Sequence, residues 1–537
     1  MTLQQVDAQF LASLHTAIGA QLPSYFPRQR WFGSKARHIH SVQLSECIPV
    51  PLSNAIALIA CARVEFLEGP GEIYVLPLIG AGLGNVPPAD LVVVRVPVLE
   101  PPSELAMVDA LSNHEFLAAI LDSIFKGESF PGNAGELQAL REEALSGLKL
   151  GPANSLPSRV LKGEQSNTSI IYADRLILKF FRRVEEGVNP DEEIGHFLTA
   201  VAPFANIPPL CGCLKYRSRE GKIATFGILQ GYVANHGDAW RSTVESLVEL
   251  FASLDHPTDQ LSGSSSQLSV APAKGVGGAS SELNAQLQLI GLLGKRTAEL
   301  HLALASSSAD PDFAPEPFTP EFREGLDAAF HDLTVRNFQT LRAAIPELPE
   351  SIAALAKEVL ALEDDALLVL HSVLERDIAS VRTRIHGDYH LGQVLFTGSD
   401  FFIIDFEGEP ARPLNERRDK RSPLQDVAGM LRSFHYAARS ASVAAQERLA
   451  RSHQPGGYVD KLAAQWRASA SSEFVRAYQQ TAGDARFLPS SPDQFAALLR
   501  VHVLEKAIYE LGYELNNRPS WVAIPLEGIR EILTTKP

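Results

Sequence analysis

Two carboxylates and a carboxamide lie close to two short apolar runs in residues 384–410, RIHGDYHLGQVLFTGSDFFIIDFEGEP. The runs VLF and FFII are joined by the turn at 397–400, so they predict a hairpin. Gln393 stands just before the first run and Asp405 just after the second, which places both side chains at one end of the hairpin. Carboxylate and amide oxygens suit a hard cation. The pair therefore predicts a Mg²⁺ site at which phosphates could be bridged.

A third polar residue, Asp388, lies five positions before Gln393. We expect Asp388 to orient and deprotonate an attacking hydroxyl, because phosphoryl-transfer sites use this spacing of loop Asp and metal-binding amide. Gln stands here for the usual Asn, and DFE for DFG. His386 is predicted to support the loop rather than act as acid or base, and Asp426 to brace it. Each residue alone could be a turn cap or a core hydrogen bonder, but the set favours a site.

A lysine in an apolar strand supports this interpretation. Lys179 lies within LILKFF, where a cation needs an acidic partner or an anionic ligand. A helix is predicted to begin near Asn189, with acidic residues in its first turn, and Glu193 on that helix is the expected partner. An edge-strand lysine whose charge reaches water is the alternative.

Small polar residues at 163–169 predict a loop between two strand-like runs, just ahead of the strand that holds Lys179. Backbone N–H groups and hydroxyls in such a loop can bind phosphate oxygens. The residues that we expect to do so are Ser166, Asn167 and Thr168. By itself the loop is equally typical of an ordinary polar hairpin turn, whereas together with Lys179 it predicts a site for the phosphates of ATP.

A predicted helix near the C-terminus carries two different stripes. The apolar stripe has helical spacing and consists of Leu504, Ile508, Leu511 and Leu515. The second stripe, with Glu510 beside it, consists of Lys506, Tyr509, Tyr513 and Asn517. Tyrosines beside charged and amide groups suit a sugar, whose faces pack on rings while its hydroxyls form hydrogen bonds. A second packed interface is the alternative.

Composition excludes several classes of protein. The 537 residues are 45% hydrophobic and 21% charged, as in globular proteins, and the net charge of −15 argues against general nucleic-acid binding. No apolar run approaches the roughly 18 residues of a membrane span. The N-terminal 22 residues predict an amphipathic helix rather than a signal peptide. We therefore expect no membrane association and a cytoplasmic location.

The order of the segments predicts an α+β fold in three parts. Residues 1–105 predict a helix followed by a strand-rich subdomain, 106–235 a strand-rich subdomain with a few helices, and 236–537 a mostly helical lobe. A Ser/Gly-rich segment at about 257–283 is predicted to be a flexible insertion.

The chain resembles bacterial maltokinases, ATP-dependent enzymes of the eukaryotic-like kinase superfamily that are related to aminoglycoside phosphotransferases. The segments that carry the resemblance are RQRWFGSKAR (28–37), GEQSNTSIIYADRLILKFFRRVEEGVNPDEEIG (163–195), LGKRTAELHLAL (293–304), HGDYHLGQVL (386–395), DFEGEP (405–410), SPLQDVAGMLRSFHYAA (422–438) and EKAIYELGYELNNRPSW (505–521). The resemblance implies a two-lobed eukaryotic-protein-kinase-like fold with an additional N-terminal cap subdomain.

The resemblance also implies the chemistry. Lys179 and Glu193 would hold the phosphates of ATP, Asp388 would be the base, and Gln393 and Asp405 would bind Mg²⁺. The residues that would lie near the sugar are Lys506, Tyr509, Glu510 and Tyr513. The implied product is maltose 1-phosphate, on a route from trehalose to glycogen, and the implied partner is trehalose synthase.

Three alternatives stay open at this point. Related kinases that share the DFEGEP signature phosphorylate glucosamine, so the signature predicts the chemistry better than the sugar. Phosphorylation of an aminoglycoside is the second alternative. The third, a silent kinase-like module that binds trehalose synthase, is disfavoured because the complete set of Lys179, Asp388, Gln393 and Asp405 is present.

Overall fold

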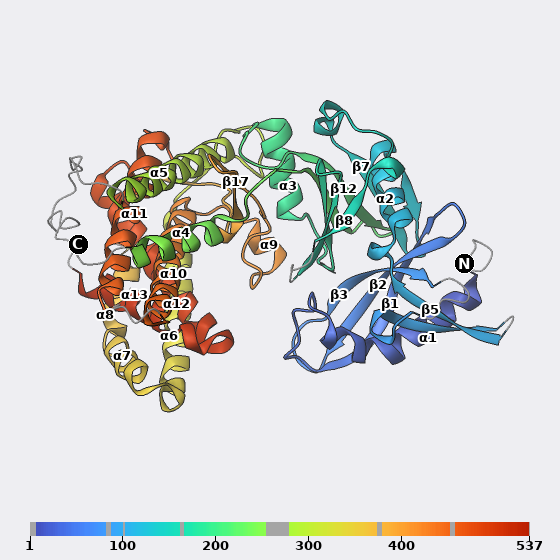
Figure 1. Ribbon diagram of the computed structural model, residues 1–537, viewed down its shortest axis with the longest axis horizontal. Coiled ribbons are helices and arrows are strands. Elements are labelled where there is room, and N and C mark those ends of the chain that lie inside the picture. The colour runs from blue at the N-terminus through green and yellow to red at the C-terminus, as the bar shows by residue number, and fades with distance from the viewer. Residues whose placement is uncertain are drawn as a thin grey trace. The chain divides into compact units, whose positions relative to one another are not determined.

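The structure, a computed structural model, describes residues 7–81, 87–99, 102–161, 166–253, 279–372, 378–451 and 457–535. The chain divides into two compact units, both drawn in Figure 1. The first consists of Met1–Ala234 and Pro410–Arg417, and the second of Asn235–Glu409 and Arg418–Pro537. The second unit begins at Asn235, and its first helix at Ala239.

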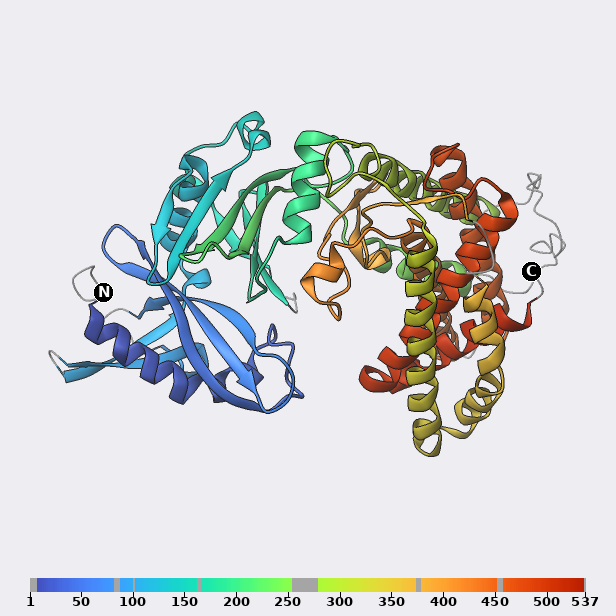
Figure 2. The same ribbon diagram turned by 180° about the vertical axis from the view of Figure 1, so that it is seen from behind.

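The first unit opens with a helix packed on an antiparallel sheet. The sheet has the strand order β1-β2-β3-β5-β4, and β11 pairs with β3. Its strands are β1 (Ile39–Pro51), β2 (Ile56–Phe66), β3 (Glu72–Gly80), β4 (Val92–Leu99), β5 (Pro102–Asp109) and β11 (Arg183–Val184). Helix α1 (Ala8–Tyr25) begins at Asp7, whose carboxylate accepts the N–H of Phe10 at 2.8 Å. Figure 2 shows α1 lying along this sheet, and the predicted amphipathic helix is confirmed.

Strand β2 explains why this sheet has apolar residues on both faces. Successive side chains of a strand point to opposite faces. Leu58 and Ala60 pack in one cluster with α1, whereas Ala57 and Ile59 belong to another cluster together with the second sheet of the unit. The first sheet is therefore a central layer, covered by α1 on one face and by the second sheet and its helix on the other.

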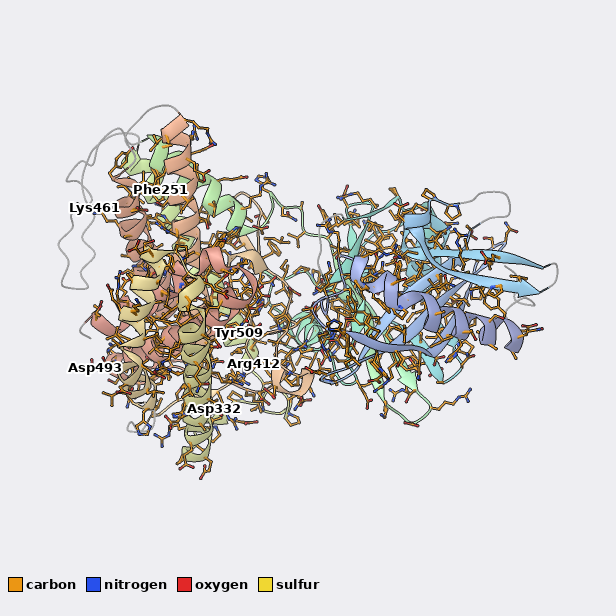
Figure 3. All side chains as sticks on the ribbon, turned by 90° about the horizontal axis from the view of Figure 1, so that it is seen from below. Phe251, Asp332, Arg412, Lys461, Asp493 and Tyr509 are labelled. Atoms are coloured by element: carbon orange, nitrogen blue, oxygen red, sulfur yellow. The ribbon has the colours of Figure 1, made fainter. Side chains whose placement is uncertain are left out.

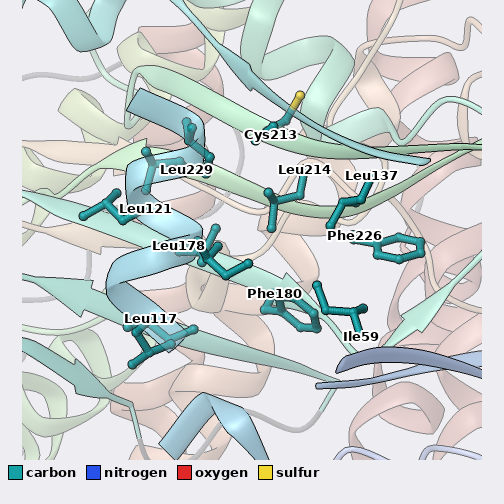
Figure 4. Packing of buried hydrophobic residues seen from close by; sticks show 14 of the residues in the cluster. Ile59, Leu117, Leu121, Leu137, Leu178, Phe180, Cys213, Leu214, Phe226 and Leu229 are labelled. Atoms are coloured by element: carbon teal, nitrogen blue, oxygen red, sulfur yellow. The ribbon is translucent and has the colours of Figure 1, made fainter. Parts of the chain in front are cut away.

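The second sheet has seven strands in the order β6-β7-β12-β13-β10-β9-β8. They are β6 (Ser129–Pro131), β7 (Gly135–Arg141), β8 (Ser158–Val160), β9 (Asn167–Tyr172), β10 (Leu176–Phe181), β12 (Leu210–Ser218) and β13 (Ile223–Gly231). Helix α2 (His114–Lys126) contributes to the same core, and α3 (Pro190–His196) follows β11. Figure 4 shows this core, in which Phe180 of β10 and Ile59 of β2 share one cluster.

The β9–β10 hairpin follows directly from its turn residues. Ala173 and Asp174 have φ angles of 51° and 50°, in the left-handed region that tight hairpin turns require. The strands pair from Leu176 opposite Tyr172 to Phe181 opposite Asn167 and so form one hairpin.

The second unit is mostly helical. Its helices are α4 (Ala239–Ser253), α5 (Ala279–Leu304), α6 (Pro320–Ala344), α7 (Glu350–Leu360), α8 (Glu363–His371), α10 (Leu424–Arg451), α11 (Val459–Ala482), α12 (Pro492–Asn517) and α13 (Ala523–Thr534). Helix α10 packs against α4, α11 and α12, and Figure 3 labels Tyr509 of α12 among these helices. Two short hairpins complete the unit: β14 (Glu316–Pro317) with β15 (Val381–Arg382), and β16 (Val394–Phe396) with β17 (Phe401–Ile403).

Two predicted boundaries need correction. The expected end of the first subdomain at 105 falls inside β5, because this strand pairs with β3 and β4 up to Asp109. Most of the expected insertion at 257–283 lies outside the described residues, but residues 279–283 already belong to α5. None of the helices that the structure describes is both long and apolar enough to cross a membrane.

Candidate active site

The hairpin β16–β17 places the expected metal ligands side by side. Val394 pairs with Ile403, and the next residue, Ile404, donates its N–H to the carbonyl oxygen of Gln393 at 3.0 Å. Asp405 follows immediately, with φ +68°, a conformation that Asp tolerates better than most side chains. Gln393 and Asp405 therefore leave the same end of one hairpin, and their oxygen donors fit Mg²⁺.

The backbone of the loop that carries Asp388 is held by Asp426, in the first turn of α10. The Asp426 side chain is 1% exposed and accepts the backbone N–H groups of His386 at 2.7 Å and of Gly387 at 2.9 Å. It also meets His301 Nε2 at 3.0 Å. Burial acts to raise the pKa of Asp426, but hydrogen bonds from His301 and Gly387 outweigh it and hold that pKa below its usual value. This network fixes the backbone just ahead of Asp388.

His386 connects the same loop to the hairpin. Its Nε2 lies 2.9 Å from the carbonyl oxygen of Ile404, and its Nδ1 faces the N–H of Asp388 at 3.4 Å. A carbonyl oxygen can only accept, so these partners assign a neutral ring with the proton on Nε2. His386 thus supports the loop, and it binds the carbonyl group of Ile404, the residue that precedes Asp405.

Replacing Asp426 by Asn should lower the stability of the folded protein. The Asn amide group would turn an N–H₂ toward backbone N–H groups, leaving a buried donor without an acceptor. We expect a loss of about 2–4 kcal/mol in the free energy of unfolding, measured in urea. Asp419→Asn is the matched control, because this aspartate is 55% exposed. An Asp426 variant as stable as the wild type would contradict the bracing role.

Helix α12 brings a cation and a tyrosine to the Asp388 loop. Lys506 Nζ lies 3.7 Å from Asp388 Oδ1 and 3.4 Å from Glu409 Oε2, and the Tyr509 hydroxyl donates to Glu409 Oε1 at 2.8 Å. Burial acts to lower the pKa of Lys506, but the carboxylates of Asp388, Glu409 and Glu510 outweigh it, and the pKa is raised. Lys506 therefore stays charged beside Asp388.

Glu409 was not among the residues predicted from the sequence. It lies four residues after Asp405, within the DFEGEP signature, and its side chain is 15% exposed. Three acidic residues within 405–409 could have drawn attention to Glu409. Their spacing does not show that one of them contacts Tyr509, 100 residues further along the chain. The structure places Glu409 where it holds both Lys506 and Tyr509.

The remaining residues of the predicted sugar face lie in different environments. Glu510 is bound by a buried arginine that the sequence did not single out, Arg432, whose Nε donates at 2.8 Å. Tyr513 is 45% exposed, and Asn517 is exposed and donates to the carbonyl oxygen of Tyr513. Arg518 lies 5.3 Å from the Tyr513 ring centroid. The polar stripe thus begins beside Asp388 and continues to an exposed aromatic residue.

Lys179 forms an ion pair with an acidic residue of the first unit, to which it belongs itself. Its Nζ lies 2.9 Å from Asp191 Oδ2, and the two side chains are 15% and 1% exposed. Asp191 stands in the first turn of α3, whose N-cap is Asn189, so the predicted helix start is confirmed. The ion pair shown is with Asp191, whereas the sequence predicted Glu193 two positions further; the pairing with Glu193 stays a prediction.

The predicted phosphate loop is partly a strand. Asn167 and Thr168 begin β9 and pair with Phe181 and Phe180 of β10, so the loop expected at 163–169 is shorter than predicted. Ser166 lies just outside the strand and is exposed, and residues 162–165 lie outside the described residues. The Thr168 hydroxyl accepts a hydrogen bond from Arg182 Nε at 2.9 Å.

Comparisons with known proteins found a matching family and several relatives. Residues 262–458 match a family described as the phosphotransferase enzyme family. A glucosamine kinase from Streptacidiphilus jiangxiensis is 25% identical over 244 residues, which are 45% of this chain and 48% of the relative. A glucosamine kinase from Mycolicibacterium smegmatis is 24% identical over 386 residues, 70% of this chain and 79% of the relative. The chain spans about half the length of the first of these relatives.

Two solved structures share the fold. A glucosamine kinase in complex with glucosamine, ADP and inorganic phosphate superposes with a TM-score of 0.60 at 18% identity, covering 97% of this chain and 99% of that one. A glucosamine kinase in its crystal form B gives a TM-score of 0.61 at 19% identity with the same coverage. The kinase-like fold is confirmed. The matching family and the two curated relatives are phosphotransferases.

Proposed function

We propose that the protein transfers the γ-phosphoryl group of ATP to a hydroxyl group of a small sugar. The observation that carries this proposal is the cluster around Asp388, in which a carboxylate on a braced loop adjoins Lys506 and the Glu409–Tyr509 pair. A carboxylate held in this way can orient a hydroxyl for attack, and positioning supplies most of the catalysis in such transfers.

The residues have separate tasks in the reaction. Asp388 accepts the proton of the sugar hydroxyl while that oxygen forms a bond to the γ-phosphorus, and the bond from phosphorus to the β,γ-bridging oxygen breaks to release ADP. Lys506 adds positive charge beside the reacting oxygen. Gln393 and Asp405 would hold Mg²⁺, which supplies positive charge to the phosphates. Lys179, held by Asp191, would contact phosphate in the first unit.

We further propose maltose as the acceptor and its anomeric hydroxyl as the site of phosphorylation. The motifs resemble those of maltokinases, and the stripe from Lys506 to Asn517 is about 16 Å long at 1.5 Å per residue, enough for more than one ring. Lys506 offsets part of the negative charge of Asp388 and Glu409 beside the acceptor hydroxyl.

Glucosamine is the second candidate, because the relatives named above are glucosamine kinases. The two sugars can be separated by one assay. Phosphorylation of the anomeric hydroxyl removes the reducing end, so maltose should lose reducing equivalents in step with ADP formation. A phosphorylated maltose that still reduces copper would contradict the anomeric assignment, and turnover of glucosamine without turnover of maltose would assign the second function.

Tyr513→Ala tests the length of the acceptor site. Tyr513 is half exposed, so its loss should disturb the fold little but remove a ring on which the second sugar could pack. Stacking of this kind is worth about 0.5–1.5 kcal/mol, which predicts a roughly 2- to 12-fold higher KM for maltose. The KM for ATP should not change. Val443→Ala, at a 44% exposed residue on α10, is the control. An unchanged KM for maltose would show that Tyr513 lies outside the acceptor site.

The possible association with trehalose synthase and the cytoplasmic location are part of the same proposal. The association derives from the resemblance to maltokinases, since trehalose synthase would supply the maltose, whereas the location is inferred from the composition of the sequence. Co-purification with trehalose synthase from cells that express both proteins would test the association, and its absence at micromolar concentrations would contradict it.

A further inference from the structure

Arg182 lies where the chain passes from one sheet of the first unit to the other. Strand β10, which carries Lys179, ends at Phe181 in the second sheet, and β11 begins at Arg183 in the first. Between them, the Arg182 carbonyl oxygen accepts the N–H of Val75 in β3 at 2.8 Å. The strand of the predicted phosphate-binding lysine is thus hydrogen-bonded to the first sheet three residues after that lysine.

The Arg182 side chain makes a second connection between the sheets. It is buried, with 3% exposure, and its Nε donates to the Thr168 hydroxyl in β9 at 2.9 Å. Its Nη2 donates to the carboxylate of Asp109, at the end of β5, and its guanidinium carbon lies 5.2 Å from the centroid of the Trp31 ring. The planar guanidinium group holds its five N–H donors in a fixed fork, whereas the lysine ammonium is a compact group on a flexible stem.

Both partners on the other side belong to the N-terminal segment that precedes the second sheet. Trp31 is 9% exposed and packs in the core of the first sheet, so its ring is a fixed surface for the cation. Asp109 supplies the negative charge that a buried arginine requires. Thr168 lies on the strand pair that the sequence assigns to phosphate binding. Arg182 therefore connects β9 with Asp109 and Trp31 of the first sheet and its core.

We propose that Arg182 is a positioning residue for the phosphates of ATP, and that the N-terminal sheet and helix serve as the support for the β9–β10 strand pair. This inference rests on the proposed function. Arg182 does not touch the reacting atoms; it acts through Thr168 and through the backbone of β10, which together fix the place of Lys179. Displacements of about 1 Å can lower turnover by roughly 100-fold, so a side chain of this kind can control the rate.

The test compares Arg182→Met with Arg183→Met in the full chain. Arg183 is the neighbouring residue, is 42% exposed and forms ion pairs with Glu72 and Glu185 of the same unit. Arg182→Met should lower kcat/KM for ATP by about 10- to 100-fold while the KM for the sugar changes less than about 2-fold. Arg183→Met should match the wild type, and Arg182→Lys should lie between, since it keeps the charge but not the directed bonds.

A double-mutant cycle with Thr168→Val separates positioning from general stability. If Arg182 acts through Thr168, the second substitution should add little to the loss of ATP affinity caused by the first, because residues of one network are not additive. If Arg182→Met does not fold, Asp109→Asn is the second variant: it removes the charge that faces Arg182, while the Asn side-chain oxygen can still accept the N–H of Leu111 that Asp109 accepts at 3.0 Å. A lower Tm with unchanged ATP parameters in these variants, or full additivity, would overturn the inference.

Failure of the proposed function would look different from failure of this inference. ATP binding by the wild type is therefore measured first, by calorimetry. A wild type that binds no nucleotide would contradict the proposed function, whereas a wild type that binds ATP and variants that bind it equally well would contradict the role of Arg182 alone.

Discussion

Asp388→Asn is expected to lower kcat by about 10²- to 10⁴-fold, the usual effect of losing a general base. Asn keeps the size of the side chain and can still face Lys506, but it cannot accept the proton of the attacking hydroxyl. The KM for ATP should change little, because Asp388 is assigned to the acceptor. Turnover at saturating maltose and ATP measures the effect.

The backbone around Asp388 should survive this substitution, because Asp426 and His386 hold the loop through its backbone, whereas the Asp388 carboxylate faces the side chains of Lys506 and His390. An unchanged Tm would confirm this. Asp419→Asn, an exposed aspartate of the same unit, controls for the loss of one negative charge. If Asp388→Asn retained a tenth or more of the wild-type kcat, another group would have to take the proton, and the assignment of Asp388 would be wrong.

Asp405→Asn is expected to abolish Mg²⁺-dependent turnover without unfolding the protein. Asp405 has φ +68°, a backbone conformation that Asn tolerates as well as Asp does, so the substitution should cost little strain. It removes the carboxylate expected to be the main anionic ligand of Mg²⁺, which the neutral Gln393 amide cannot replace. Turnover measured across a Mg²⁺ titration would show whether the loss follows metal binding.

Two outcomes would separate the metal role from a structural one. Partial recovery of turnover at high Mg²⁺ is expected if the variant binds the ion weakly. Near-wild-type turnover at low Mg²⁺ would contradict the metal assignment, and a large fall in Tm would show that the Asp405 carboxylate supports the fold instead.

The parts of the fold that sequence predicts best are those with a local cause. The hairpin at 394–403 follows from two apolar runs and a turn, and the start of α3 follows from Asn189 and Pro190. In the same way, the helical spacing of the apolar residues in α12 predicts which face of the helix is buried. Leu504, Ile508 and Leu511 on this face are fully buried. Each signal lies within a few residues of the structure that it predicts.

The parts that sequence does not predict depend on contacts between distant segments. The ion pair of Lys179 with Asp191 is such a contact, since no local spacing shows that this carboxylate of the first turn of α3 reaches the lysine. Glu409 meets Tyr509, and Arg432 meets Glu510, across gaps of 100 and 78 residues that no local spacing reveals. The subdomain boundary at 105 was placed too early for a related reason, since the pairing of β5 with β3 extends the first sheet to Asp109.

The central claim is that the protein moves a phosphoryl group from ATP to a sugar, and one measurement tests it most directly. ADP and sugar monophosphate are quantified by mass analysis in the same samples, after incubation of the wild type and of Asp388→Asn with ATP, Mg²⁺ and either maltose or glucosamine. We predict one maltose monophosphate for each ADP with the wild type and almost none with the variant. ADP formed without any phosphorylated sugar, or a phosphorylated sugar formed equally well by Asp388→Asn, would contradict the account.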